Sequence, residues 1–386
     1  MELKKGKKGA PRQIRLYKSQ KAPMDYSILL VVTGLCAFGL VMVFSASYYY
    51  ALHNAGCNYD GFYYLKRQGI YMAIAYPLML IISKINYRYI KRLSSAALVV
   101  SLILLVAVLA FGKELNGGKR WLYLGPVSIQ PSEVAKFGLI IYMCNYMANH
   151  RGEEMRSFTK GLLPMLGVIG VVCFFIFLQP NMSMAVIVAA IGFILLYLGG
   201  IDLKYFGILA VVGVVLFMVL ALSADYRIAR MTSFRDPWSD PKGSGYQLIQ
   251  SLFAIGSAGW FGKGLGNSYQ KLLYMTYGES DFIFAILCEE FGIVGGIVII
   301  LAYAWIVFRG LRCAMLCTNP FGSLLAAGIS IVFGMQVFIN IAVVTGLAPT
   351  TGQPLPFISA GGTSLIIFMA AMGVLLNITR ETSNLA

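Results

Sequence analysis

The strongest constraint on this chain is a series of long apolar segments. Each of ten runs, about 18 to 25 residues long, could cross a hydrocarbon layer of roughly 30 Å as a helix. Only 12% of the residues are charged, about half the share in a soluble domain. We therefore expect an all-α, polytopic integral membrane protein with ten transmembrane helices. The runs begin near Tyr26, Gln68, Leu93, Pro131, Gly161, Met182, Leu203, Phe282, Phe321 and Gly361.

The position of the positive charges predicts how the chain crosses the membrane. The net charge is +15, but the basic N-terminal tail lacks the interleaved aromatic residues of a nucleic-acid-binding face. Ten spans place both termini on one side, and the short basic connections indicate the cytoplasmic side. We expect a basic tail over 1–24, one transmembrane domain over 25–380 and a short tail over 381–386. The cytoplasmic cations would be the eight of the tail, Lys84, Arg88, Lys91, Arg92, Arg151, Arg156, Lys160, Lys204, Arg309, Arg312 and Arg380.

On the opposite, outer side the connections are longer and chemically distinctive. They comprise Phe111–Glu133, a long loop of about 223–280 between the seventh and eighth spans, and Thr345–Ser364. The last segment contains Pro349, Gly352, Pro354 and Pro356, which exclude a continuous helix. It should form a re-entrant or folded loop against protein or a wet cavity, although a connector without a role is the alternative.

Ionisable residues inside apolar spans are costly and indicate function. Glu133 and Lys136 lie three residues apart at the start of the fourth span, where they can neutralise each other. We consider substrate binding and a structural ion pair equally for them. Glu289 and Glu290 lie about two turns into the eighth span, and we favour a supporting role with cationic partners for these two.

Asp281 stands at the junction of the long outer loop and the eighth span, directly after Ser280, a good N-cap residue. The helix dipole would favour its ionised form. An ionised acid beside a membrane cavity suits a general base, although simple helix capping is the alternative. The cations that share its loop suit an anionic, phosphorylated ligand; they are Arg227, Arg230, Arg235, Lys242, Lys263 and Lys271.

Other chemistries lack their motifs. There is no Walker loop, and the segment Gly259–Ser268 is only a Gly-rich turn. A donor used outside the cell must arrive already activated, and a lipid-linked pyrophosphate meets that need. The two histidines, His53 and His150, are far apart and have no metal-ligand companions, so no protein metal site is expected. The need for a divalent cation, Mg²⁺ or Mn²⁺, is left open.

Three long motifs together resemble the SEDS family (FtsW, RodA, SpoVE) of bacterial cell-wall polymerases. They are "GKRWLYLGPVSIQPSEVAKFGLIIYM", the stretch from "RMTSFRDPW" to "SDFIFAILCEEFGIVGG", and "GLAPTTGQPLPFISAGGTS" with its continuation to "LLNITR". The resemblance implies a ten-span fold and a peptidoglycan glycosyltransferase that joins lipid II on the outer face of the bacterial cytoplasmic membrane and releases undecaprenyl pyrophosphate. It also implies a class B penicillin-binding protein as partner.

Within this resemblance Asp281 matches the essential acid of "DFIFA", which implies a general base acting on the 4-hydroxyl of the acceptor sugar. The resemblance also matches five polar motif positions, namely Arg120, Glu133, Lys136, Arg230 and Arg235. The predicted substrate-binding set consists of these five residues together with Lys263 and Lys271. The residues predicted to support the site are Glu289, Glu290, Pro349, Gly352, Pro354 and Pro356.

Two features qualify the resemblance, and two rival functions are alternatives to a polymerase. Asn181 stands where the family usually carries an acid, so we assign no catalytic role to its loop. The motifs are closer to the FtsW and SpoVE branch, which favours septal or spore-cortex synthesis over side-wall growth. A lipid II flippase fits the same buried charges, but no symmetric halves are evident. A noncatalytic scaffold would explain the basic tail but not the charge-rich outer loop.

Overall fold

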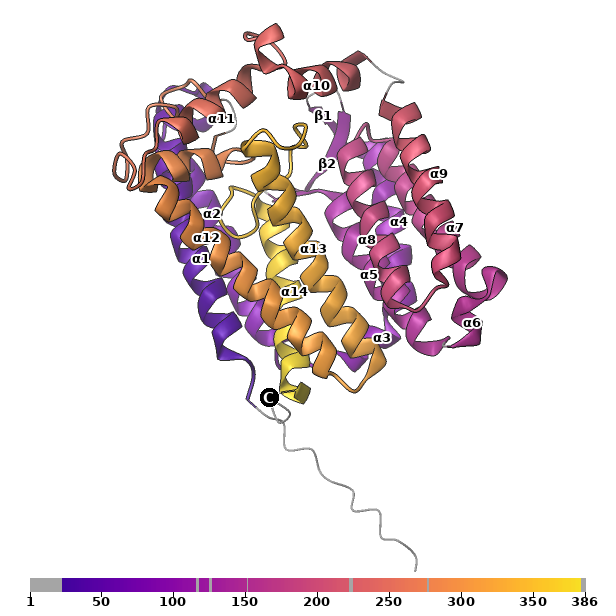
Figure 1. Ribbon diagram of the computed structural model, residues 1–386. Coiled ribbons are helices and arrows are strands. Elements are labelled where there is room, and N and C mark those ends of the chain that lie inside the picture. The colour runs from indigo at the N-terminus through magenta and orange to yellow at the C-terminus, as the bar shows by residue number, and fades with distance from the viewer. Residues whose placement is uncertain are drawn as a thin grey trace, which may run out of the picture.

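The structure, a computed structural model, describes residues 23–382 except 116–117, 125–126, 151, 222–224 and 276–277. Most of the predicted basic tail, together with Arg151 and residues 383–386, lies outside the described part. Ten described helices of 15 or more residues occupy the ten predicted positions (Figure 1). They are α1 (Tyr26–Leu52), α2 (Tyr63–Ile82), α4 (Ser94–Phe111), α5 (Pro131–Asn149), α7 (Leu163–Phe177), α8 (Met182–Leu198), α9 (Leu203–Ala221), α12 (Ile283–Leu316), α13 (Pro320–Val344) and α14 (Gly362–Thr382).

Six helical segments in the described part are long and apolar enough to cross a membrane. They are α1, α4, α12, α13, α14, and α7 together with the preceding turn η2 (Phe158–Leu162). The helix α8 and part of α9 are apolar but shorter, and α2 and α5 carry charged residues. A multi-pass membrane protein is therefore confirmed, while the full ten-span threading remains a prediction.

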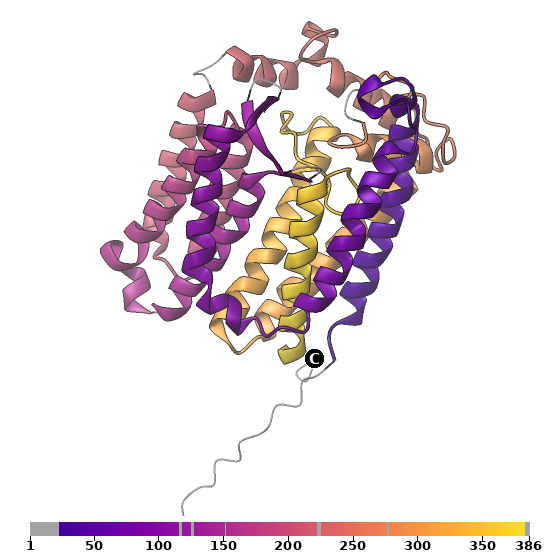
Figure 2. The same ribbon diagram turned by 180° about the vertical axis from the view of Figure 1, so that it is seen from behind.

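The order of burial shows which helices form the centre. In the most apolar windows of α13 and α14, 67% and 72% of the residues are buried, against 28% to 39% in the other four segments. Both views place α13 and α14 between one group of helices, α1, α2 and α12, and another group, α4, α5, α7, α8 and α9 (Figures 1 and 2). The peripheral helices therefore expose apolar faces that suit lipid contact.

Local sequence explains where several helices begin. Asp25 caps α1 by accepting a hydrogen bond from the Ser27 amide, and Asn319 caps α13 in the same way. Proline occupies the first turn of α5 and of α13, where a missing N–H has no cost. Asn181 caps α8, so the residue that departs from the family's acid has a local structural role here.

Both ends of the described chain meet at one end of the bundle. The Asp25 amide donates to the Thr379 hydroxyl oxygen at 3.1 Å, and the Asp25 carboxylate pairs with Arg309 of α12. The short basic helix α3 (Arg88–Arg92) and the short helix α6 (Glu153–Arg156) lie at this same end (Figure 1). The basic connections thus share one face of the bundle, as their pattern predicts.

The opposite end carries a cap of loops and short elements (Figure 2). It includes α10 (Asp225–Arg235), α11 (Tyr246–Gly256) and two short 3-10 turns, η1 (Ala55–Cys57) and η3 (Pro237–Ser239). We call it the loop end. It also contains a three-stranded antiparallel sheet of β1 (Lys113–Leu115), β2 (Gly118–Leu124) and β3 (Val127–Ile129).

This sheet corrects the all-α prediction. Lys113 of β1 lies opposite Trp121 of β2, and Tyr123 of β2 lies opposite Ser128 of β3. The alternating aromatic residues of β2 favour a strand because large rings pack well on a pleated surface. Apolar runs of membrane-spanning length predict the helices, whereas this short connecting segment carries a period of two instead.

Candidate active site

Asp281 lies at the loop end, in the segment that leads into α12. The helix begins at Ile283, and its N-cap residue, Phe282, makes no side-chain capping bond. The expectation that Ser280 caps this helix is therefore wrong. The Ser280 hydroxyl instead donates to the Asp281 carboxylate over 3.0 Å, because the loop turns this side chain toward its neighbour rather than toward the first helical amides.

The proline-rich segment from Thr345 to Gly361, which we call the proline loop, holds the backbone around Asp281. The Ala360 amide donates to the Glu279 carbonyl at 2.9 Å, and the Ser359 hydroxyl donates to the Ser280 carbonyl at 2.6 Å. Residues 355–359 are buried, which confirms the prediction of a folded loop packed against protein. Gly352, at φ +68°, lies so close that an added Cβ would be 3.4 Å from the Asp281 carboxylate.

Two side-chain amides of α13, those of Asn340 and Gln336, hold the proline loop by hydrogen bonds. Asn340 donates to the carbonyls of Asp281 and Gln353, at 2.8 and 2.7 Å. Gln336, one turn away, donates to the Pro354 carbonyl at 3.0 Å. These two buried polar residues sit inside an apolar helix, so the rule that intramembrane polar groups indicate function could have found them.

The charge state of Asp281 differs from the expectation. Burial raises its pKa above the usual range, and the hydrogen bond from Ser280 and the positive charge of Arg230 oppose this effect only in part. The predicted dipole effect does not dominate, because desolvation of a carboxylate outweighs the field of a helix end that the side chain does not cap. A carboxylate with a raised pKa is a stronger base once it is ionised.

Two cavities have wall residues near the segment Glu279–Asp281, although Asp281 itself is in neither wall. The first, of about 240 Å³, is lined by Arg120, Arg230, the start of α8 and the first half of the proline loop, including Thr350 and Thr351. We call it the arginine cavity. Among the described residues its wall contains two guanidinium groups and no carboxylate. Such a wall suits an anionic ligand such as a pyrophosphate.

Hydrogen bonds hold both arginines of this cavity. Arg120, in β2, donates to the Gln179 carbonyl at 3.2 Å and also to the Pro180 carbonyl. Arg230, in α10, donates to the Thr350 carbonyl at 3.5 Å. The loop before α8, to which the sequence gives no catalytic role, thus forms part of the cavity wall together with Asn181.

The second cavity, of about 290 Å³, adjoins Glu279 and Ser280. We call it the aromatic cavity, because the rings of Tyr64, Tyr71, Trp121 and Tyr123 line it. Its polar wall residues include Arg67, Gln68, Ser128 and Glu279. None of these residues belongs to the predicted site set, although Arg67 lies at the edge of an apolar run, where a charge indicates function.

Glu133 and Lys136 form a buried ion pair in α5. Their charged atoms lie 2.9 Å apart, and each side chain is 1% exposed. Lys136 also donates to the Gln336 side chain at 2.7 Å, and its ammonium lies 4.9 Å from the ring centre of Phe368. Since Gln336 donates to the Pro354 carbonyl, this pair supports the proline loop. The geometry favours the structural alternative that the sequence left open.

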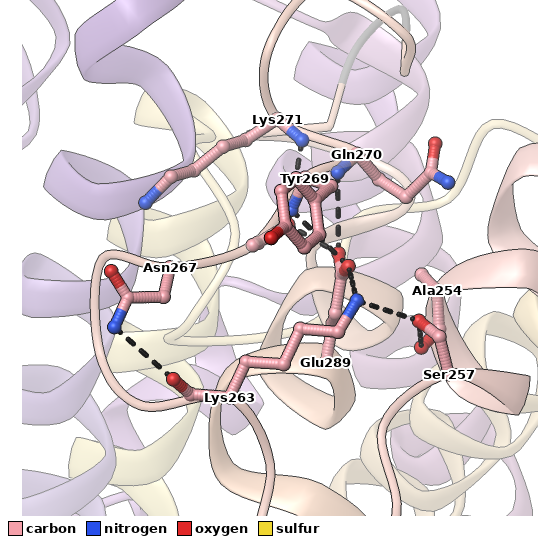
Figure 3. Close-up of polar contacts among 9 residues, drawn as sticks. Ala254, Ser257, Lys263, Asn267, Tyr269, Gln270, Lys271 and Glu289 are labelled. Carbon is pink, nitrogen blue, oxygen red and sulfur yellow. Dashed lines mark hydrogen bonds and ion pairs between the residues drawn. The ribbon is translucent and has the colours of Figure 1, made fainter.

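Glu289 and Glu290 have the cationic partners expected of them. Lys263 contacts the Glu289 carboxylate at 2.6 Å, and Lys271 contacts that of Glu290 at 2.9 Å. Glu289 also accepts from the Ser268 hydroxyl and from the amides of Tyr269 and Gln270. Figure 3 shows Glu289 at the centre of these groups. The two lysines, predicted to bind substrate, are held by acids of the protein itself.

A break in α12 explains how this loop attaches. At Gly292 the backbone leaves the helical conformation, with φ +76°. The carbonyls of Glu289 and Glu290 accept from the amides of Lys263 and Gly264, both at 2.9 Å. Beyond the break, the amides of Ile293 and Val294 donate to the carbonyls of Gly259 and Trp260. The Gly-rich turn therefore replaces the helix's own hydrogen bonds, as buried backbone groups require.

Some of the remaining predicted residues lie at the cavities or in the proline loop, and others lie away from them. Pro349 lines the arginine cavity, and Pro356 is held by a hydrogen bond from the Tyr303 hydroxyl to its carbonyl. Arg235, by contrast, is exposed at the end of α10 and lines neither cavity as the described residues form them. The side chain of Arg227 lies outside the described part. Of the predicted cations, Arg120 and Arg230 are therefore the ones that the structure brings to a cavity beside Asp281.

Comparison with known proteins decides the family. Residues 26–384 match the family described as "Cell cycle protein" (FtsW/RodA/SpoVE). The chain belongs to the FtsW/RodA/SpoVE family. This FtsW/RodA/SpoVE protein is similar to Stage V sporulation protein E of Bacillus subtilis (38% identity, covering 94% of this chain and 98% of the relative). It is also similar to a probable peptidoglycan glycosyltransferase FtsW of Aliivibrio salmonicida (39% identity, covering 94% and 90%).

Solved structures agree with this family assignment. The FtsW/RodA/SpoVE chain superimposes with a TM-score of 0.75 and 26% identity on a chain from a structure titled "Structural coordination of polymerization and crosslinking by a peptidoglycan synthase complex", covering 93% of this chain and 98% of the other. The rod shape determining protein RodA from Thermus thermophilus gives a TM-score of 0.68 at 24% identity, with 93% and 98% covered. The second similarity shows a shared fold.

Proposed function

We propose that this protein is a peptidoglycan glycosyltransferase that polymerises lipid II into glycan strands and releases undecaprenyl pyrophosphate. The single observation that carries the proposal is the position of Asp281, whose neighbour Ser280 lines the aromatic cavity and whose neighbour Gly352 follows two wall residues of the cavity with two arginines. A polymerase must bring a leaving pyrophosphate and an attacking sugar to one reacting carbon. Relatives named FtsW glycosyltransferases, 37% to 40% identical over more than nine-tenths of the chain, support the same activity.

In the proposed reaction Asp281 acts as the general base. Its carboxylate accepts the proton of the acceptor's 4-hydroxyl while that oxygen attacks the anomeric carbon of the donor sugar. The carbon–oxygen bond to the pyrophosphate breaks, its electron pair leaves with the pyrophosphate, and the anomeric configuration inverts. Arg120 and Arg230 would stabilise the charge that develops on the leaving group.

The other charged residues support this arrangement from a distance. Lys263 and Lys271 hold the outer loop through Glu289 and Glu290, and Glu133 with Lys136 holds the proline loop through Gln336. No group of three or more His, Cys, Asp or Glu in the described ranges could hold a metal ion. We therefore assign no step to a protein-bound Mg²⁺ or Mn²⁺.

The active site would face the outside of a bacterial cytoplasmic membrane. The end of α12 that follows Asp281 lies opposite the termini and the basic connections (Figure 1), and the positive-inside rule assigns those to the cytoplasmic side. A class B penicillin-binding protein is the proposed partner, since the similar structure of a peptidoglycan synthase complex couples polymerisation to crosslinking. Similarity to SpoVE and FtsW favours a role in sporulation or division.

The decisive experiment replaces the proposed base. Purified Asp281→Asn protein, assayed with its partner on lipid II, should lose at least about 100-fold of its polymerisation rate, the usual contribution of a general base. Asp60→Asn is the matched control, because Asp60 makes an exposed ion pair with Lys66 at the same end of the bundle. Undiminished polymer from Asp281→Asn would refute the proposal. Translocation of labelled lipid II in proteoliposomes without polymer would indicate a flippase instead.

A further inference from the structure

The aromatic cavity has a different chemical character from the arginine cavity. Its wall combines four aromatic rings with one cation, Arg67, and one carboxylate, Glu279, among the residues that the structure describes. Arg67 already donates to the Ser128 hydroxyl at 3.2 Å and lies 5.9 Å from the ring centre of Tyr71. Because this single cation is already engaged and the arginine cavity has two, the aromatic cavity is the poorer site for a pyrophosphate.

Two buried polar groups of this cavity point to a neutral polar ligand. Glu279 is only 7% exposed, and burial raises the pKa of its carboxyl group. Tyr71 is 4% exposed, and its hydroxyl has no hydrogen-bond partner of normal geometry among the described residues. Arg67 interacts electrostatically with this hydroxyl. Because buried polar groups are nearly always satisfied, a hydroxyl without a full hydrogen bond in a cavity wall has capacity for a ligand or water.

Aromatic rings together with hydrogen-bonding groups match the surface of a pyranose sugar. The rings can pack against the apolar C–H face of the sugar, and the carboxylate and amide groups can bind its hydroxyl and acetamido groups. The volume of about 290 Å³ is near the lower limit of typical ligand sites, roughly 300 Å³. The cavity therefore suits one sugar ring better than a longer glycan.

The position of the cavity relates it to Asp281. Ser280 lines the cavity and donates to the Asp281 carboxylate over 3.0 Å. Ala360, Gly361 and Gly362 close the same wall where the proline loop meets α14. Gly352, which lies close to the Asp281 carboxylate, directly follows Thr350 and Thr351 in the wall of the arginine cavity. Each cavity thus has wall residues next to a neighbour of Asp281, while Asp281 itself lines neither cavity.

We propose that the aromatic cavity is the subsite for the acceptor's N-acetylated sugar ring, with Glu279 and Tyr71 binding its polar groups. This inference rests on the proposed glycosyltransferase function and assigns each cavity a part of the reaction. The arginine cavity receives the pyrophosphate of the donor. The aromatic cavity holds the attacking sugar with its 4-hydroxyl toward Asp281. Glu279 and Tyr71 then determine which acceptor is accepted.

The test uses a soluble probe without lipid or phosphate. Triacetylchitotriose, a trimer of N-acetylglucosamine, is titrated against the purified full chain, and its dissociation constant is measured by ligand-observed NMR. Saturable binding is expected, with at least a fivefold weaker constant for Glu279→Gln and for Tyr71→Phe. Glu114→Gln should bind as the unsubstituted protein does, because Glu114 is exposed on β1 and does not line the cavity.

Further arms separate the alternatives. The trimer is titrated without lipid II, so the result does not depend on turnover and can fail independently of the proposed function. Inorganic pyrophosphate should not displace the trimer. The inference is overturned if the unsubstituted protein shows no saturable binding, if pyrophosphate competes, or if Glu279→Gln and Tyr71→Phe bind as tightly as Glu114→Gln. Unfolding midpoints identify a variant that fails to fold, and the other variant then decides.

Discussion

The side-chain amide of Asn340 donates a hydrogen bond of 2.8 Å to the main-chain carbonyl of Asp281. The same amide group donates to Gln353 of the proline loop. One residue of the central helix α13 therefore fixes both the backbone of the proposed base and the loop that faces it. This relationship explains how a reactive carboxylate in a loop can keep a defined position.

The first prediction concerns this anchor. Asn340→Ala leaves two buried carbonyls without a donor and should lower the free energy of unfolding by about 1–3 kcal/mol. The polymerisation rate should fall more than stability alone explains, at least about tenfold, because misplaced catalytic groups are costly. Unfolding midpoints and lipid II assays measure the two effects. Phe338→Ala is the control, since Phe338 is 71% exposed. Equal rates for both variants would contradict the anchoring role.

The second prediction concerns pH. Because the pKa of Asp281 is raised, ionising it in the folded state costs free energy. Folding stability from this group is full at low pH and is lost as pH rises through the raised pKa. Asp281→Asn should therefore unfold at a higher temperature than the unsubstituted protein near pH 8, and the difference should shrink as pH falls. A difference that is constant with pH would contradict the raised pKa.

The third prediction concerns Arg230, whose effect on the pKa of Asp281 is opposite to that of burial. Its positive charge lowers the pKa of Asp281, so Arg230→Met should move that pKa higher. As the pH is lowered, Arg230→Met should therefore lose polymerisation activity at a higher pH than the unsubstituted protein does. Arg235→Met, at an exposed position away from both cavities, should leave the acidic limb of the profile in place. A shift of the same size in both variants would refute a specific effect of Arg230.

The fourth prediction concerns the buried pair in α5. Lys136→Met leaves Glu133 charged and buried, which should cost about 3–5 kcal/mol of stability. Adding Glu133→Gln should recover most of this loss, as measured by unfolding midpoints in detergent. Lys66→Met breaks an exposed pair and should cost at most about 1 kcal/mol. Failure of the double variant to recover would show that Lys136 has a role beyond charge compensation.

The fifth prediction concerns the break in α12. An added Cβ at Gly262 would lie 2.2 Å from the Glu290 carbonyl oxygen, and the backbone there has φ +76°. Gly262→Ala should therefore detach the Gly-rich turn and increase amide hydrogen exchange in Lys263 and Gly264, whose amides bind across the break. Gly256→Ala is the matched control, since no described neighbour lies within 4 Å of its Cβ. Unchanged exchange in Gly262→Ala would contradict the docking.

Much of the architecture could be predicted because it depends on local properties of the chain. The apolar runs place the ten long helices within a few residues, and the prolines of the Thr345–Ser364 segment predict a non-helical loop. The charge pattern places the basic connections on one face. Hydropathy and proline content act within about twenty residues, so the printed sequence carries this information directly.

The candidate site could be predicted only in part. Asp281 and the pairing of Glu133 with Lys136 follow from position and helical spacing. The charge state of Asp281 does not, because burial by distant segments outweighs the local dipole. The three-stranded sheet was missed because its short strands are stabilised by pairing with each other, not by a long local pattern.

Local properties of the chain specify a membrane protein of long apolar helices with a few ionisable groups within or beside them. The pairing of these charges, in contrast, depends on how the helices and loops pack. Lys263 and Lys271 could have faced a substrate, but the break in α12 brings Glu289 and Glu290 to them. Glu279 and Arg67 come from segments more than 200 residues apart and meet in one cavity wall. Ion pairs and cavities form between distant segments, and their partners are fixed by packing, which no local pattern encodes.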